Sequence, residues 1–317
     1  MLRKFIYNRI FRTTGMLLLL LLLLLFPASK EYSLEDEKIT KLVMSETSKK
    51  EVYLLDRNGY VSRCHININY SNTKDAAKKL IEILIQDGKY EDKIPNGFKA
   101  ILPPDTIINN VYIENNNITI DLSKDILELK EDNFKKMLQL VTYNLTTLDN
   151  IKNVYIKVNN KLLDNYNNKI ITQPFKRSDG VNNEYNEINY KNISKTTIYY
   201  VCKNNNKNYY VPVTKINNSN EDKIKIIINE LASSNIYETN LMSFLNYNTK
   251  LNNYEINDKE MIIDFNNYLF DDINSKTILE EVIYTISLSV RDNYDINTVV
   301  FKVNGKEITK SVLKDIE

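Results

Sequence analysis

Apolar positions follow the same pattern twice along the chain. The segment Ile118–Leu122 corresponds to Met261–Phe265, and Val154–Lys161 corresponds to Val299–Lys306. The offset is about 145 residues, whereas the units of solenoid proteins are about 20–50 residues long. The pattern therefore predicts two copies of a whole domain, each large enough to bury its own core.

Alternating apolar residues predict strands in each copy, and apolar stripes at helical spacing predict helices. In the first copy we expect a helix between the capping residues Asn72 and Thr73 and the terminating Gly88, and a second helix from about Asn133. The strands expected there are Val52–Leu55, Tyr60–Asn69, Val111–Ile113, Ile118–Leu122 and Val154–Val158.

The second copy keeps this order, with Ser219 and Asn220 as the expected caps of its first helix and Ile278–Val290 as its second. Its expected strands are Ile198–Val201, Tyr209–Val213, Tyr254–Ile256, Met261–Ile263 and Val299–Val303. Each copy reads ββαββαβ, which predicts an α+β sandwich with both helices on one face of a mixed or antiparallel sheet.

The N-terminus reads as a targeting segment. Four basic residues precede an apolar run of nine leucines that ends at Pro27, and the positive flank predicts export of the remaining chain. At its longest the run would span about 24 Å as a helix, less than a bilayer core of about 30 Å. A cleaved signal peptide and a retained membrane anchor both remain open.

These patterns divide the 317 residues into five parts. Residues 1–28 are a signal peptide or anchor, 29–50 a charged stalk, 51–163 the first domain, 164–195 an Asn-rich linker and 196–317 the second domain. Beyond the four N-terminal basic residues, acidic residues outnumber basic ones, which argues against binding of nucleic acid.

Three segments of the first copy resemble one known family. Phe98–Thr106, the strand with Ile120–Ser123, and Tyr155–Lys161 are similar to the GerMN domain, an extracytoplasmic domain associated with bacterial sporulation and spore germination. The resemblance implies a compact α/β domain similar to the ring-building motifs of envelope assemblies. It also implies a location between the two membranes of the developing spore, and no catalytic residues.

The chain departs from the family pattern in two places. Tandem members are typically lipoproteins, but no cysteine follows the apolar run before Cys64. In the second copy the Leu-Pro-x-x-Thr segment becomes Leu245–Thr249 without proline.

Asp121 and Asp264 are matched carboxylates at the ends of core strands. An acid–base pair would need both in one site, but they lie in different copies. We therefore expect each to accept backbone N–H groups at the turn into the second helix.

Cys64 and His65 suggest a nucleophile and a base, but neighbouring residues on a strand point to opposite faces, so these two side chains cannot hydrogen-bond to each other. His65 is the only histidine, so other histidine-based catalytic or metal sites are excluded. A disulfide between Cys64 and Cys202 would have to cross the domain junction, so we expect two free thiols.

Lys157 and Lys302 occupy matched places on the last predicted strands. We expect these strands to be sheet edges. The lysines would protect the edges from pairing with other strands, or would contact a partner or an anionic wall polymer.

No cofactor or metal site is predicted. We expect a non-catalytic assembly protein of the spore envelope, with envelope proteins, its own copies in a ring, and peptidoglycan as partners. The alternatives are a cell-wall enzyme, or an accessory of such an enzyme, that binds or cuts peptidoglycan, and a soluble ligand-binding module.

Overall fold

The first copy contains the expected hairpins and helices. In the computed structural model, which describes residues 41–43, 49–185, 193–204, 207–233 and 240–312, the polar turn Asn58–Gly59 joins the first two strands. The Asn72 side chain accepts a hydrogen bond from Asp75 N and so caps the first helix, as predicted. The main elements are β2 (Lys50–Asp56), β3 (Val61–Ile66), α2 (Thr73–Glu82), β5 (Ile108–Glu114), β6 (Asn117–Leu122), α3 (Glu131–Leu145) and β7 (Asn153–Val158).

The second copy repeats this order with longer strands in its first hairpin. Its first helix begins at Lys223, with Asp222 as the N-cap residue, so the prediction of Ser219 and Asn220 as caps was wrong. The main elements are β12 (Ser194–Asn204), β13 (Lys207–Asn217), α4 (Lys223–Ala232), β14 (Leu251–Asn257), β15 (Glu260–Phe265), α5 (Glu280–Asn293), β16 (Thr298–Val303) and β17 (Lys306–Val312).

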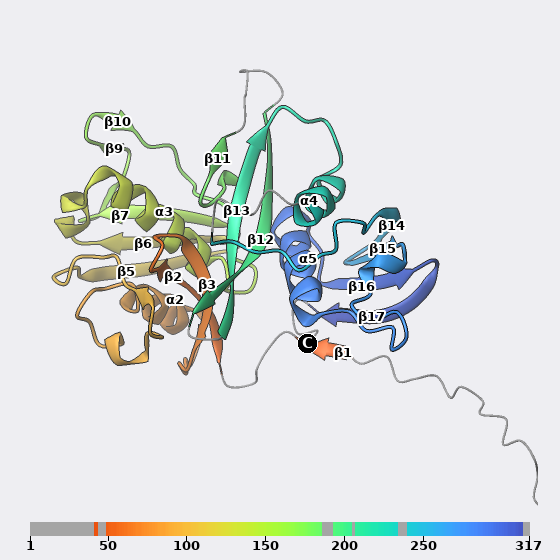
Figure 1. Ribbon diagram of the computed structural model, residues 1–317. Helices are drawn as coiled ribbons and strands as arrows, with labels where there is room; N and C mark the ends of the chain where they lie inside the picture. The colour runs from red at the N-terminus through yellow and green to blue at the C-terminus, as the bar shows by residue number, and fades with distance from the viewer. Residues whose placement is uncertain (1–40, 44–48, 186–192, 205–206, 234–239, 313–317) are drawn as a thin grey trace, which may run out of the picture. The chain divides into compact units, whose positions relative to one another are not determined.

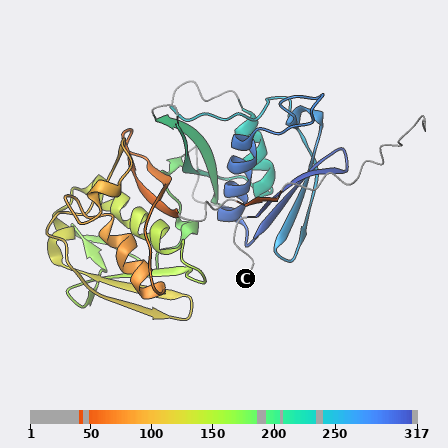
Figure 2. The same ribbon diagram turned by 90° about the horizontal axis from the view of Figure 1, so that it is seen from below.

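Each copy is a sandwich of three layers, in which the two helices lie between the first hairpin and a mixed sheet (Figures 1 and 2). In the mixed sheets, β6 runs parallel to β7 and antiparallel to β5, and β15 relates to β16 and β14 in the same way. This arrangement confirms the predicted α+β sandwich and adds that the first hairpin covers the opposite face of the helices.

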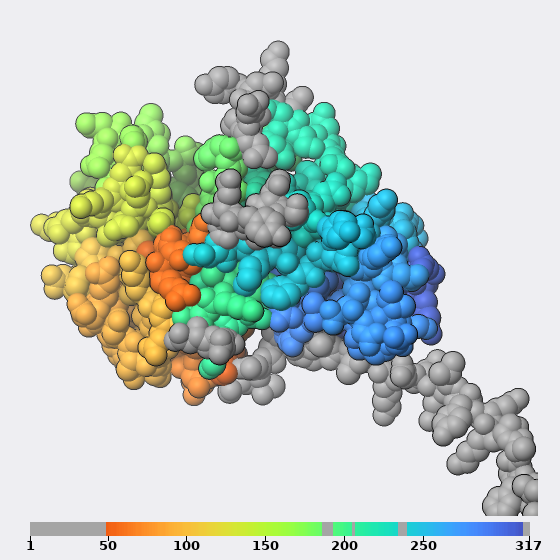
Figure 3. Space-filling model, viewed as in Figure 1, coloured from red at the N-terminus to blue at the C-terminus, as the bar shows by residue number. Residues whose placement is uncertain are grey.

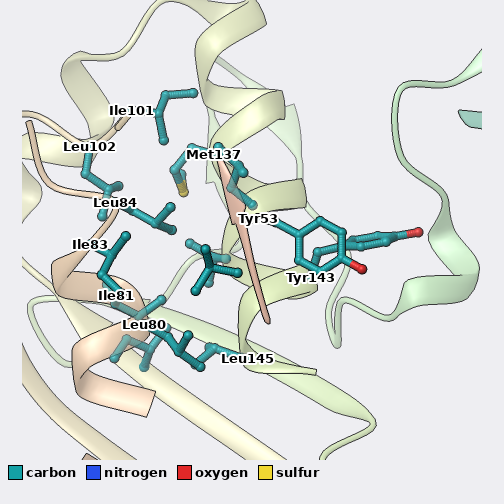
Figure 4. Packing of buried hydrophobic residues seen from close by; sticks show 14 of the residues in the cluster. Tyr53, Leu80, Ile81, Ile83, Leu84, Ile101, Leu102, Met137, Tyr143 and Leu145 are labelled. Atoms are coloured by element: carbon teal, nitrogen blue, oxygen red, sulfur yellow. The ribbon is translucent and has the colours of Figure 1, made fainter. Parts of the chain in front are cut away.

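Two separate apolar cores correspond to the two copies. In the first, Leu80 and Ile81 of α2 and Met137 and Leu145 of α3 belong to one buried cluster that also includes Tyr53 of β2 (Figure 4). The second core is built by β12, β13, α4, α5 and the mixed sheet of that copy. The two cores agree with a duplicated domain.

The first hairpins of the two copies are joined in one sheet. Strand β13 pairs antiparallel with β3 through Tyr210 and Arg63, and β4 (Phe98–Lys99) pairs with β2 at the far side. Nearby, the β2–β3 turn contacts the segment that begins at residue 240, where Asn240 Nδ2 donates to Asn58 Oδ1 at 3.3 Å (Figure 3). Residues 41–317 form one compact unit.

The segment 164–195, predicted to be a linker, packs against the first copy over most of its described length. Tyr166 and Val181 belong to the first core. Around them lie short elements: β8 (Lys161–Leu162), β9 (Asn165–Tyr166), β10 (Lys169–Ile170), the 3-10 helix η3 (Arg177–Asp179) and β11 (Glu184–Tyr185). Three further 3-10 helices are η1 (Glu91–Lys93), η2 (Lys124–Glu128) and η5 (Asn267–Leu269).

Strands β7 and β16 are interior strands, so the prediction that they form sheet edges was wrong. Strand β17 pairs with β16 along its length, and β1 (Lys41–Val43) adds to β17 in parallel. Strand β7 is covered by β8 and by the segment after it, where Gln173 and Phe175 bond to the backbone of Ile156 and Val154. In the part of the chain that the structure describes, the edges of the two mixed sheets are β5 and the short β8 in the first copy, and β14 and the short β1 in the second.

The predicted targeting segment, residues 1–28, lies outside the described residues. Among the helices that are described, none is long and apolar enough to cross a membrane.

Candidate functional site

Asp121 and Asp264 do accept backbone hydrogen bonds, but at a different turn from the one predicted. Asp121 Oδ1 accepts from Asn160 N at 3.0 Å, and Asp264 Oδ1 accepts from Gly305 N at 2.9 Å. These donors belong to the tight turns after β7 and β16, whose residues Asn159, Asn160, Asn304 and Gly305 all have positive φ. The two carboxylates fix equivalent turns in separate sheets, and the structure does not bring them into one acid–base site.

Lys157 and Lys302 are half-buried on the faces of their sheets that point away from the helices. Each lies opposite one of the matched aspartates, Lys157 beside Asp121 and Lys302 beside Asp264 in the strand register. Lys157 Nζ also lies 5.8 Å from the ring centroid of Tyr112. Their role in an interface stays a prediction.

Cys64 and Cys202 are buried free thiols. Burial raises the pKa of the Cys64 thiol, so it is protonated at neutral pH and is not activated as a nucleophile. In the part of the chain that the structure describes, no group of three or more His, Cys, Asp or Glu side chains could hold a metal ion.

The most unusual chemistry lies between the two copies, where charged side chains are buried. Glu51 of β2 receives two hydrogen bonds from the guanidinium of Arg291 on α5, each at 2.9 Å. The Arg63 guanidinium of β3 lies 3.0 Å from the same carboxylate, and its side chain is 4% exposed. This pairing joins the first strands of one copy to the second helix of the other.

Arg177 makes a second connection from the segment between the copies. Its Nη1 atom donates to both carboxylate oxygens of Asp292 on α5, at 2.8 and 3.0 Å. Its Nε donates to Thr146 Oγ1 and its Nη2 to the carbonyl of Tyr143, both at the end of α3. The guanidinium also lies over the Tyr143 ring, 4.5 Å from its centroid. One side chain thus binds both copies.

Two buried tyrosines lie between these ion pairs. The hydroxyl oxygens of Tyr53 and Tyr199 are 2.8 Å apart. The Tyr199 hydroxyl donates to Asp292, and that of Tyr53 donates to Glu51 and accepts from Arg291. Burial raises the pKa of both tyrosines, so they remain neutral donors. The interdomain cluster, as we call Glu51, Tyr53, Arg63, Arg177, Tyr199, Arg291 and Asp292, is therefore hydrogen-bonded across the junction.

Burial alone would raise the pKa of the Glu51 carboxyl, but the charges of Arg291 and Arg63 outweigh it and hold that pKa well below its usual range. Glu51 is consequently ionised at any physiological pH. The ion pairs of the cluster connect side chains of both copies, so they can hold the two copies in a fixed arrangement.

The sequence pattern alone did not identify the interdomain cluster. A usable indication was present in the arginines, since the chain relies on lysine and has only four arginines after residue 50, namely Arg57, Arg63, Arg177 and Arg291. Three of these four belong to the cluster. Arginine suits buried bidentate pairing better than lysine does, so rare arginines in a lysine-rich chain point to such sites.

The two copies match a known family model, Germane: Sporulation and spore germination, over residues 51–164 and 197–309. The chain is 34% identical over 271 residues to the spore germination protein GerM of Bacillus subtilis (strain 168), covering 83% of this chain and 73% of that protein. A solved structure, the tandem GerMN domains of the sporulation protein GerM from Bacillus subtilis, matches with a TM-score of 0.74 and 33% identity. The match covers 83% of this chain and 93% of that one.

Proposed function

Because the chain belongs to the Germane family of sporulation and spore germination proteins, we propose that it is a non-catalytic assembly protein of the spore envelope. In this proposal it acts outside the cytoplasm, in the space between the membranes of the developing spore. Its N-terminal segment delivers it there and either anchors it or is removed.

The observation that carries the proposal is the interdomain cluster. Hydrogen-bonded ion pairs across the junction hold the two copies as one unit, so surfaces on different copies keep a fixed spacing. A scaffold needs such a fixed spacing, whereas an enzyme needs an accessible reactive group. The related protein GerM is named for sporulation and germination and not for a reaction.

We propose envelope proteins of the spore, and further copies of the same chain, as partners. Lys157 and Lys302 are the candidate contacts, because they present matched positive charges on the outer faces of the two mixed sheets. Each is half-buried beside an aspartate, so replacement by glutamate would place two carboxylates side by side and disturb the sheet. Replacement by glutamine removes the charge without this repulsion.

The test is the double variant Lys157→Gln and Lys302→Gln, expressed as the only copy in sporulating cells. We expect stability within about 0.5 kcal/mol of wild type, loss of envelope partners from affinity capture, and fewer mature spores. The matched control is Lys161→Gln with Lys306→Gln, which removes two exposed lysines at the adjoining turns. Unchanged partner recovery and normal sporulation in the first variant would contradict the proposed contacts.

The enzyme alternative has its own test. The purified chain is incubated with spore peptidoglycan in a zymogram, beside a lysozyme control. Clearing by the chain would contradict the non-catalytic assignment, whatever the result of the lysine variants.

A further inference from the structure

An open cavity of about 850 Å³ lies mainly in the second copy, with Ser178 of the segment between the copies also in its wall. It lies where the start of β12, the loop that leads into α4, the end of α5 and strand β14 meet. This volume is in the range of sites for small ligands, about 300–1,000 Å³. It lies apart from Lys157 and Lys302, and only Asp292 is shared with the interdomain cluster.

The lining has the chemistry of a site for a neutral, hydrogen-bonding ligand. Three acidic residues line the cavity, namely Glu221, Asp222 and Asp292, beside two lysines, Lys195 and Lys223. Asp292 is already paired with Arg177, so the four remaining charges balance. Hydroxyl and amide groups come from further residues of the lining: Ser178, Ser194, Thr197, Ser219, Asn220 and Asn293. The balanced charges disfavour a strongly anionic or cationic ligand. Ile193 is the single aliphatic residue of the lining, so most of its apolar surface comes from the stems of polar side chains and from tyrosine rings.

Two tyrosines complete the wall. Tyr254 of β14 and Tyr294 at the end of α5 both pack their inner sides against the second core. The Tyr294 hydroxyl accepts a hydrogen bond from Ile224 N, which fixes it at the first turn of α4. Tyrosine combines a rigid apolar ring with a polar tip, which suits a ligand that has both C–H faces and hydroxyl groups.

The first copy has different side chains at the positions that correspond to this cavity. There the helix start is closed by its own side chains, since Asn72 caps α2 and Asp75 bonds to Ser71 and Lys79. In the second copy, Asp222 makes no side-chain capping bond and pairs instead with Lys225, one turn into α4. Val111 of β5 stands at the strand position that corresponds to Tyr254, since each lies opposite the matched Ile120 or Ile263. The cavity lining is thus a property of the second copy and not of the repeated fold.

We propose that this cavity binds an uncharged, hydroxyl-rich glycan segment, with Tyr254 as the ring on which a sugar face rests and Asn220 as a hydrogen-bonding partner. An N-acetylated sugar fits best, because its amide complements the Asn220 side chain while its ring supplies the C–H face. This inference does not depend on the proposed assembly role.

The test is titration of the purified full-length chain with the N-acetylglucosamine tetramer. Binding is measured by calorimetry and by NMR signals of the ligand. The glucose tetramer serves as the comparison for the acetamido group, and inorganic phosphate as the comparison for an anion. We expect saturable binding of the N-acetylated tetramer, weaker binding of the glucose tetramer, and none of phosphate.

Two variants locate the site. Tyr254→Ala should weaken binding about tenfold through loss of the ring contact. Asn220 lies on an exposed loop, so Asn220→Ala does not disturb the core. This variant should weaken binding severalfold, because it removes the proposed hydrogen-bonding partner. The matched control is Tyr112→Ala, which removes an exposed tyrosine from the mixed sheet of the first copy and should leave binding unchanged. Absence of saturable binding, preference for phosphate, or wild-type affinity in both cavity variants would overturn the proposal.

Discussion

The two copies attach their second helix to their first hairpin with different side chains, at one equivalent position and, in the second copy, at one further position. In the first copy, Asn144 of α3 accepts from Tyr53 N at 3.0 Å and donates to Tyr53 O at 2.8 Å. In the second copy, Ser289 of α5 accepts from Tyr199 N, and Asn293, one turn later, pairs with both backbone groups of Thr197. Both copies therefore pair these buried backbone groups with a helix side chain, but the residue that does so differs between the copies.

A second difference concerns the strand that follows the second helix. Strand β16 is closed by β17, a full partner strand, whereas much of β7 is closed by the Gln173 side chain and by Phe175 from the segment between the copies. In the first copy, the connecting segment thus provides much of the hydrogen bonding along this strand that β17 provides in the second copy. The two domains are alike in topology but unequal in what completes them.

The largest effect should come from removing the shared carboxylate of the interdomain cluster. Glu51→Ala leaves Arg63 and Arg291 buried without their partner, and we expect a loss of about 3–5 kcal/mol in the free energy of unfolding. Urea denaturation measures this change. Glu131→Ala is the control, because Glu131 pairs with Lys135 and Lys169 at an exposed site and should cost no more than about 1 kcal/mol. Equal losses in the two variants would show that the cluster does not join the copies.

Acid should weaken the same contact. The pKa of Glu51 is depressed in the folded chain relative to the unfolded value of about 4.3, so its stabilisation is fully present above that value. The stabilisation is lost as the pH falls through the folded pKa. We expect Glu51 to add no slope to the stability between pH 7 and about 5 and to steepen its decline below about 4.5. Glu51→Gln should make the acid decline shallower, and an unchanged slope in that variant would contradict the assignment.

A smaller effect distinguishes the two helix attachments. Asn144→Ala leaves both backbone groups of Tyr53 unpaired. At about 1 kcal/mol for each group, the lower end of the usual range, we expect a loss of about 2 kcal/mol. Ser289→Ala leaves only Tyr199 N without its partner, so it should cost about half as much. Thermal unfolding of both variants gives the ratio. A larger loss for Ser289→Ala would mean that the second copy depends on a single contact after all.

The smallest effect should follow from Gln173→Ala. Water can replace the amide at the strand, so we expect a loss of only about 0.5–1.5 kcal/mol. Amide hydrogen exchange at Ile156 of β7 should become faster, while exchange at Val300 of β16 serves as the internal control and should not change. Equal acceleration at both amides would indicate general loosening in place of a local opening.

Much of the fold could be predicted because hydrophobic periodicity reports on burial within one copy. The hairpins, the four helices and the Asn72 cap follow from local patterns. Strand β17 was missed because its sequence alternates weakly, and its pairing depends on the turn at Asn304–Gly305 bringing it back to β16. The packing of residues 164–185 was missed because it depends on contacts such as Gln173 with Ile156, which no local pattern encodes.

The interdomain cluster could not be derived for a similar reason. Arg177 and Asp292 are 115 positions apart, and each looks like an ordinary surface residue in its own segment. The repeat identifies which positions are equivalent, but it does not say that equivalent residues meet. Asp121 and Asp264 show the converse case. They are matched residues that accept equivalent backbone hydrogen bonds, each within its own copy.

Tyr53 and Tyr199 are equivalent residues whose hydroxyl groups meet, and β3 pairs antiparallel with its counterpart β13. At these two places the junction resembles the interface of a dimer with two-fold symmetry. Such a dimer between separate chains dissociates on dilution. Here a peptide chain joins the two halves, and a short tether typically gives an effective concentration in the millimolar range. The junction therefore forms equally well at any protein abundance, including the few molecules available when expression has only begun.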